Sequence, residues 1–200
     1  MGEPARILIV CTGNICRSPF IERLLQRELD ARGSGFGQGG IIVRSAGTGA
    51  LVGSPMDPQA AAQLLAHGGD PSGFRARELT TALIAESDLV LTATRQHRGR
   101  VTAMLPAAMR RVFTFCDFAD LVEGIEAPGD LAGAGSAPSG LAHWVRQLTE
   151  KAAASRGLKP PLQPDLADIV DPYRLEDEVF ATMAQQIVEP MPVVVRSLVA

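Results

Sequence analysis

The residues of this sequence with the clearest chemical potential lie close together near its start. Cys11 and Arg17 are separated by five residues, and Ser18 follows directly. Such a loop can curl round one small tetrahedral anion, with successive backbone N–H groups pointing inward and the arginine closing on the anion as a planar fork. A thiol beside an arginine and a helix N-terminus is stabilised as the thiolate, the form that attacks phosphorus. We therefore predict a phosphate-binding loop with Cys11 as its nucleophile.

The residues around this pair suit the same loop. Gly13 removes a side chain where the backbone must turn tightly, and Asn14 tolerates a left-handed conformation. Ser18 can donate a hydrogen bond to the sulfur, and Pro19 suits the first turn of a helix. The competing interpretation, a structural cysteine and a surface arginine joined by a Gly-Asn turn, does not account for the whole string. The phosphate-binding residues that we expect are Thr12, Gly13, Asn14, Ile15, Cys16, Arg17 and Ser18.

A second candidate lies near the other end of the chain, where Asp171, Pro172 and Tyr173 precede a helical pattern. Breaking a phosphate ester requires a proton for the departing oxygen, and a carboxylic acid on a loop can supply it. Pro172 restricts the backbone and so aims the carboxyl group of Asp171. On its own this triplet would fit a turn before a helix, and the cysteine loop is what favours catalysis. Asp168 is the rival acid and lacks the Pro-Tyr context.

Hydrophobic patterning predicts the elements that position these residues. The apolar run before Cys11 reads as a buried strand, residues 6–10, and a helix is expected from 19 to 32 with its apolar residues on one face. A second strand, 41–44, makes a strand–helix–strand unit that predicts a right-handed parallel crossover. Further strands are expected at 88–92 and 111–115, and further helices at 57–67, 81–86, 95–105, 141–156 and 175–188. Residues 33–40 and 123–140 are rich in glycine and read as loops.

Composition limits the class of protein. The chain has 200 residues, a formal net charge of −3 and three cysteines. That length fits a single domain over residues 1–200, and without a basic run we expect no nucleic-acid partner. No apolar stretch approaches the roughly 20 residues that span a bilayer, and the start of the chain lacks a signal-peptide pattern. Three cysteines make no disulfide framework, so we expect a cytoplasmic protein with reduced thiols and no membrane partner. His97 has no partner at metal-ligand spacing, so we expect no metal.

The string VCTGNICRSP, from Val10 to Pro19, resembles the signature of the low-molecular-weight protein tyrosine phosphatases. Asp-Pro-Tyr at 171–173 is similar to the second half of that signature, and Ser-Ala-Gly-Thr at 45–48 also matches the family pattern. The resemblance covers residues 5 to about 118 and 166 to about 190. The interval from about 120 to 165 looks like an insertion that is atypical of the family, and it would serve as a lid, a partner-docking helix or a packed decoration.

The resemblance implies a single-domain α/β fold, with a four-stranded, mainly parallel sheet and helices on both faces. It implies a cofactor-free and metal-free phosphatase in which Cys11 is the nucleophile, Arg17 binds the phosphoryl group and its transition state, and Asp171 is general acid and then base. Tyr173 would be an aromatic wall of the pocket, and Ser45 would support Asn14. The aliphatic Leu51 is similar to the bacterial subgroup that works alongside exopolysaccharide tyrosine kinases, so the implied partner is a phosphotyrosine protein, such as a bacterial tyrosine kinase.

Several alternatives stay open at this point. Arsenate reductases share the fold and loop but need a further cysteine pair, whereas only Cys116 remains. Phosphoarginine phosphatases carry threonine at the fifth loop position, where this chain has Ile15. A phosphate-binding, redox-sensing module without catalysis is the non-enzyme alternative. In the family a cysteine at position 16 can form a reversible disulfide with the nucleophile, and the other interpretation is that Cys16 packs under the loop. Phe74 stands where many members have a supporting histidine.

Overall fold

The computed structural model describes residues 3–33, 40–127 and 139–199. Within these ranges a four-stranded sheet has the order β2-β1-β3-β4, and each neighbouring pair is parallel. The strands are β1 (Ala5–Cys11), β2 (Ile41–Gly47), β3 (Leu89–Thr92) and β4 (Val112–Thr114). The predicted α/β fold is therefore confirmed, with a sheet that is parallel throughout. Cys11 lies at the carboxyl end of β1, the edge where open parallel sheets bind ligands.

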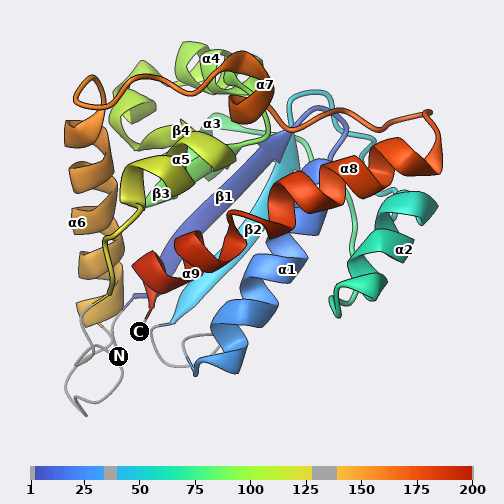
Figure 1. Ribbon diagram of the computed structural model, residues 1–200, viewed down its shortest axis with the longest axis horizontal. Coiled ribbons are helices and arrows are strands. Elements are labelled where there is room, and N and C mark those ends of the chain that lie inside the picture. Colours follow the sequence, from blue (N-terminus) through green and yellow to red (C-terminus); the bar gives the residue numbers. More distant parts are fainter. Residues whose placement is uncertain (1–2, 34–39, 128–138, 200) are drawn as a thin grey trace.

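Helices cover both faces of this sheet (Figure 1). Their bounds are α1 (Arg17–Ala31), α2 (Pro58–Ala66), α3 (Thr81–Ala85), α4 (Arg95–Met104), the 3-10 helix η1 (Pro106–Arg111), α5 (Phe115–Val122), α6 (Ser139–Ser155), α7 (Pro164–Ala167), α8 (Asp177–Val188) and α9 (Met191–Leu198). Helices α1, α5, α8 and α9 pack on one face, and α3, α4 and η1 on the other. The segment between α7 and α8 crosses the carboxyl end of the sheet (Figure 1).

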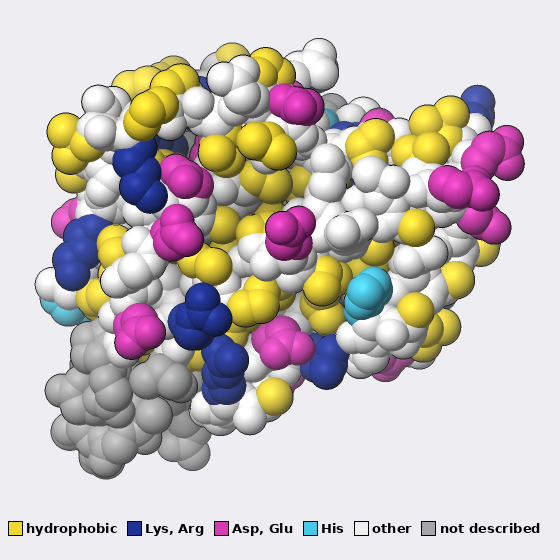
Figure 2. Space-filling model, in the orientation of Figure 1, with side chains coloured by type: hydrophobic (Ala, Val, Ile, Leu, Met, Phe, Trp, Pro, Cys, Tyr) yellow, Lys and Arg dark blue, Asp and Glu magenta, His cyan; other side chains and the backbone are white. Residues whose placement is uncertain are grey.

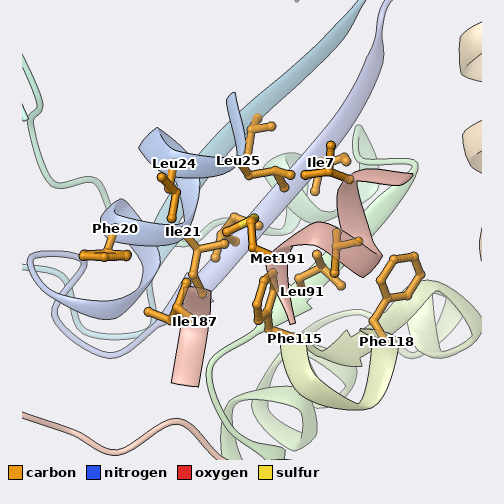
Figure 3. Packing of buried hydrophobic residues seen from close by; sticks show 14 of the residues in the cluster. Ile7, Phe20, Ile21, Leu24, Leu25, Leu91, Phe115, Phe118, Ile187 and Met191 are labelled. Carbon is orange, nitrogen blue, oxygen red and sulfur yellow. The ribbon is translucent and has the colours of Figure 1, made fainter. Parts of the chain in front are cut away.

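The two faces of β1 bury different hydrophobic clusters, because successive side chains of a strand point to opposite sides. Ile7 and Ile9 belong to the larger cluster, and Leu8 and Val10 belong to the smaller one. In the larger cluster an apolar face of α1 meets side chains of α5, α8 and α9 (Figure 3). The helix that follows the cysteine loop is thus fixed along its whole buried face, and the loop starts and ends on rigid elements.

Two parts of the sequence-based prediction were wrong. Phe115 was expected in the last strand, but it begins α5, because the Thr114 hydroxyl accepts a hydrogen bond from the N–H of Asp117 (3.0 Å) and so caps a helix there. Helix α9 was not predicted, because Pro190 and Pro192 flank its first residue and read as breakers. Proline is in fact tolerated in the first turn of a helix.

The predicted insertion contains a packed helix. Trp144, Val145 and Leu148 of α6 are buried, and the Trp144 indole N–H donates to the carbonyl of Ser197 in α9 (2.9 Å). The three roles considered for this interval, a lid, a partner-docking helix or a packed decoration, stay predictions. Most of the expected loops at 33–40 and 123–140 lies outside the described residues. In the described part of the chain, every helix is too short or too polar to cross a membrane.

Candidate active site

The loop from Cys11 to Arg17 is held by the segment that follows β2. The N–H of Thr48 donates to the carbonyl of Cys11 (2.9 Å), and those of Gly49 and Leu51 donate to Thr12 (3.2 Å) and Gly13 (3.0 Å). Further on, the N–H of Asp57 donates to the carbonyl of Ile15 (2.9 Å). These four bonds fix the backbone of the loop from outside, as an anion-binding nest requires.

Asn14 holds the loop together from inside the protein. Its backbone has φ of 54°, a left-handed conformation that few residues adopt, and its side chain is fully buried. The amide nitrogen donates to the hydroxyls of Ser18 (2.9 Å) and Ser45 (2.8 Å), and the amide oxygen accepts from the backbone N–H of Arg77 (2.8 Å). The expected contact between Asn14 and Ser45 is therefore present. Three hydrogen bonds stabilise a conformation that would otherwise be strained.

Ser18 lies directly beneath the sulfur of Cys11. Its oxygen is 2.9 Å from Cys11 Sγ, and the same oxygen accepts from Asn14 Nδ2. A hydroxyl has one proton to give, and since the Asn14 amide can only donate here, that proton is available to the sulfur. Asn14 thus donates to Ser18, and Ser18 can in turn donate to the sulfur of Cys11.

Glu22 supports the other side of this network, and sequence analysis missed it. The Ser45 hydroxyl donates to Glu22 Oε2 at 2.5 Å, and Glu22 is only 5% exposed. Burial raises the pKa of Glu22, while the hydrogen bond from Ser45 and the charge of Arg77 oppose that rise. Phe74, which stands in place of the family histidine, is buried in the core. The loop is therefore supported by a carboxyl group; the only signal in the sequence was an acidic residue inside an apolar helix face.

Arg17 joins the phosphate loop to the loop that carries Asp171. Its side chain is 5% exposed, and its two terminal nitrogens reach Asp171 Oδ2 (2.6 Å) and the carbonyl of Ile169 (3.3 Å). Asp171 is 52% exposed, and its other oxygen accepts from the N–H of Tyr173 (3.3 Å). The structure thus brings together the cysteine, the arginine and the acid that the sequence singled out. Asp168, the rival acid, is bound to Arg95 instead.

A single pocket is lined by these groups and by the two predicted wall residues. Cys11, Arg17 and Asp171 line it together with Leu51 and Tyr173, which lie on opposite loops and remain partly exposed. The remaining lining residues are Thr12, Gly13, Ile15, Cys16 and Gly49. The pocket has a polar floor for an anion and an apolar mouth for a ring. In the ranges that the structure describes, carboxylates, thiols and imidazoles form no group of three that could hold a metal ion.

His97 also reaches the phosphate loop, although the sequence gave it no role. Its Nε2 lies 2.9 Å from the Thr12 hydroxyl, and its Nδ1 lies 2.6 Å from the Thr94 hydroxyl. Burial and the nearby charge of Arg17 lower the pKa of His97 to about 4. The ring is therefore neutral at physiological pH and acts as a hydrogen-bonding link between α4 and the loop.

The two other cysteines are poor thiolates. Cys16 precedes α1 and packs in the larger core, and burial together with Asp57 raises its pKa. Burial and the neighbouring Asp117 raise the pKa of Cys116 to about 12. All three cysteines are unpaired in this structure. Both interpretations of Cys16, packing under the loop and a reversible disulfide with Cys11, stay predictions.

The fold and this pocket define a class of protein: an α/β domain with a cysteine and an arginine on one loop at the carboxyl end of its first strand, facing an aspartate from a second loop. A sequence profile described as "Low molecular weight phosphotyrosine protein phosphatase" matches residues 6–154. Among bacterial relatives, a probable low molecular weight protein-tyrosine-phosphatase, EpsP of Ralstonia nicotianae, is 40% identical over 107 residues, which are 54% of this chain and 68% of EpsP. Etp of Escherichia coli is 39% identical over 109 residues, with the same shares covered.

Solved structures agree. Wzb of Vibrio vulnificus, in complex with benzylphosphonate, superposes with a TM-score of 0.64 and 27% identity over 97% of this chain and 99% of that one. The chain therefore belongs to the low molecular weight phosphotyrosine protein phosphatase family, as the resemblance of its two motifs predicted.

Proposed function

We propose that this chain hydrolyses phosphotyrosine in proteins through a phosphocysteine on Cys11. The observation that carries the proposal is that Cys11, Arg17 and Asp171 line one pocket. A nucleophile, a transition-state cation and a proton donor are the three groups that phosphate-ester hydrolysis requires.

In the first step the Cys11 thiolate attacks phosphorus, and the bond from phosphorus to the phenol oxygen breaks as the new S–P bond forms. Asp171 gives its proton to the departing phenol oxygen. The guanidinium of Arg17 and the N–H groups of the loop hold the other phosphoryl oxygens, which is electrostatic preorganisation. Because Arg17 Nη2 lies 2.6 Å from Asp171, an arriving phosphoryl group must take over this fork, and that exchange frees the carboxyl group for the leaving oxygen.

In the second step Asp171, now a carboxylate, takes a proton from a water molecule. The water oxygen attacks phosphorus and the S–P bond breaks, which releases inorganic phosphate and restores the thiolate. The hydrogen bond from Ser18 stabilises the sulfur as it leaves, because its oxygen lies 2.9 Å from Cys11 Sγ. Throughout both steps Leu51 and Tyr173 would flank the aromatic ring of the substrate.

The substrate that this site fits is a phosphotyrosine on a protein surface, and a bacterial tyrosine kinase is the partner that we propose. The aliphatic Leu51 is 44% exposed and Tyr173 is 41% exposed, so the mouth of the pocket is open enough for a residue on a folded partner. Acidic side chains gather at the start of α8, beyond Tyr173 (Figure 2).

Unpaired cysteines favour a cytoplasmic setting. We propose that residues 1–200 form a single domain and that residues 120–165 are a decoration on it.

The test compares turnover of an aryl phosphate, a phosphotyrosine peptide and a phosphoarginine peptide by the reduced protein. Wild type, Cys11→Ser and Asp171→Asn are measured in parallel. We expect turnover of the tyrosine substrate that vanishes in Cys11→Ser and falls by about 10²–10⁴-fold in Asp171→Asn, the range typical of general acids. Preference for phosphoarginine would overturn the inference from Ile15. Absence of turnover by wild type, with phosphate still bound, would favour the binding module.

A further inference from the structure

Asp168 makes a set of contacts that the proposed mechanism does not use. Its Oδ1 accepts from the backbone N–H of Arg95 at 2.7 Å, at the start of α4. The Arg95 guanidinium bonds both carboxylate oxygens, with Nη2 to Oδ2 at 3.0 Å and Nε to Oδ1 at 3.2 Å. The carboxylate therefore receives a planar fork and an N–H group at the positive end of a helix. The loop that carries Asp171 is attached to α4 through this pair.

The chain between Asp168 and Asp171 is short and held at each step. The N–H of Ile169 donates to the carbonyl of Ala93 (2.9 Å), and the N–H of Val170 donates to Gln186 Oε1 (2.9 Å). Asp168 itself has extended backbone angles, φ −109° and ψ 125°. Three residues of extended chain span at most about 10 Å. The Asp168 carboxylate is thus the first of three successive contacts that fix the backbone leading to Asp171.

The same turn of α4 also holds the phosphate loop. His97 is the third residue of this helix and bonds Thr12 through Nε2 (2.9 Å), while the hydroxyl of Thr94 caps the helix and bonds His97 Nδ1 (2.6 Å). Ala93, just before the helix, is tied to β1 through its N–H and the carbonyl of Val10 (2.8 Å). Residues 93–97 thus contact both the loop with the nucleophile and the loop with the acid.

We propose that Arg95 and Asp168 are a positioning pair that sets the carboxyl group of Asp171 over the leaving oxygen. The proposal rests on the acid role proposed for Asp171. The pair is partly exposed, with side-chain exposures of 41% and 30%. Such pairs contribute little to folding stability, so its contribution lies in the placement of the acid relative to Cys11.

The chain offers a matched control at the opposite end of the sheet. Asp88 also accepts a backbone N–H, from Arg6 (2.9 Å), and an arginine side chain, from Arg146 (3.1 Å). It precedes β3 and lies far from the loop that ends β1. Asp88→Ala removes the same kind of contact as Asp168→Ala without touching either catalytic loop.

The test measures kcat/KM for aryl phosphates whose leaving phenols range from strongly acidic to as weakly acidic as tyrosine. A poor leaving group needs the acid and a good one does not. We expect Asp168→Ala to lose roughly tenfold with the weakly acidic phenols and less than about twofold with the most acidic one, since small misplacements are costly only where the group acts. Arg95→Ala should show a smaller selective loss, because the backbone N–H of residue 95 remains. Asp88→Ala should resemble wild type.

The double variant Asp168→Ala/Asp171→Asn completes the design. If Asp168 acts only through Asp171, the double variant loses no more than Asp171→Asn alone. Equal losses across the whole series, or additive losses in the double variant, would overturn the positioning pair. If Asp171→Asn itself shows no selective loss, the acid assignment fails and the pair fails with it. A selective loss in Asp171→Asn with none in Asp168→Ala overturns the pair alone.

Discussion

The phosphate loop and the loop that carries Asp171 meet in one pocket but are held very differently. Most of the phosphate loop is buried, and its carbonyls at Cys11, Thr12, Gly13 and Ile15 are each bonded by the segment that follows β2. Asn14 alone makes three side-chain hydrogen bonds. Asp171 is half exposed, and its carboxyl group contacts only Arg17 and the N–H of Tyr173 among the described residues.

This difference follows from what each loop does in the proposed reaction. An anion cradle must hold its N–H groups still, because reorganisation at the moment of reaction would cost the stabilisation that it provides. The acid must release Arg17, reach a leaving oxygen and later approach a water molecule. The comparison therefore predicts that changes in the phosphate loop lower both stability and activity, whereas changes at the acid lower activity alone.

Among changes in the phosphate loop that keep Cys11, the largest effect is expected for Arg17→Lys. The guanidinium fork contacts the acid loop through two nitrogens, and lysine keeps the charge but loses the planar pair of donors. We expect kcat/KM for an aryl phosphate to fall by about 10²–10³-fold, as when one transition-state donor is removed. Steady-state kinetics measure this, and a loss below about fivefold would contradict the proposed role of the fork.

Asn14→Ala should come next and should lower both quantities. It removes three hydrogen bonds and places alanine at φ of 54°. We expect unfolding in urea to show a loss of about 2–3 kcal/mol, with activity lower by roughly 10–100-fold. Asn14→Gly removes the backbone strain but does not restore the three hydrogen bonds. It should therefore be more stable than Asn14→Ala and less stable than wild type.

Asp171→Asn provides the contrast in the acid loop. Because the Asp171 side chain is 52% exposed, the free energy of unfolding of the Asp171→Asn variant should stay within about 1 kcal/mol of the wild-type value. A loss of stability as large as that of Asn14→Ala would break the comparison between the two loops.

Gly47→Ala should act on stability more than on chemistry. A Cβ at this position would overlap the carbonyl oxygen of Thr12, a backbone atom of the phosphate loop, whereas a Cβ at Gly49 meets no neighbouring atom. We expect Gly47→Ala to cost about 1–3 kcal/mol and to lower Tm by several degrees in a thermal scan. Gly49→Ala is the matched control and should melt like wild type. Equal Tm values for the two variants would contradict this prediction, because they would mean that the phosphate loop moves away from the added Cβ without loss of stability.

The smallest effect is expected for Tyr173→Ala. Tyr173 is 41% exposed and lines the pocket mouth, so its removal loses contact with the substrate ring but none of the groups that act on phosphorus. We expect KM for aryl phosphates to rise about three- to tenfold, in line with the contact energy of one aromatic side chain, with kcat little changed. A large fall in kcat with an unchanged KM would instead assign Tyr173 to the chemical steps.

Much of the fold and of the pocket could be predicted from the sequence, because their signals are local. The apolar run before Cys11, the spacing to Arg17 and the triplet at 171–173 each lie within a few residues. The support around them is not local: Glu22 meets Ser45 across 23 positions, His97 meets Thr12 across 85, and Arg95 meets Asp168 across 73. A single sequence shows no sign of such pairs.

Two of these residues, Arg95 and His97, also resembled ordinary surface positions, because they read as a solvated basic helix start. Glu22 gave only the signal of an acidic residue inside an apolar helix face. Helix α5 was missed for a related reason, since a phenylalanine-rich stretch fits a strand until Thr114 caps a helix.

The measurement that tests the central claim most directly is rapid quench with a denaturant at neutral to alkaline pH during turnover of an aryl phosphate, followed by mass spectrometry of the peptide that contains the phosphate loop. Denaturation stops turnover before the S–P bond is hydrolysed, so the phosphoryl group can be located. The proposed mechanism predicts a burst of phenol of about one equivalent per enzyme and a phosphoryl group on Cys11, absent in Cys11→Ser. A phosphoryl group on another residue, or turnover without any phosphoenzyme, would contradict it.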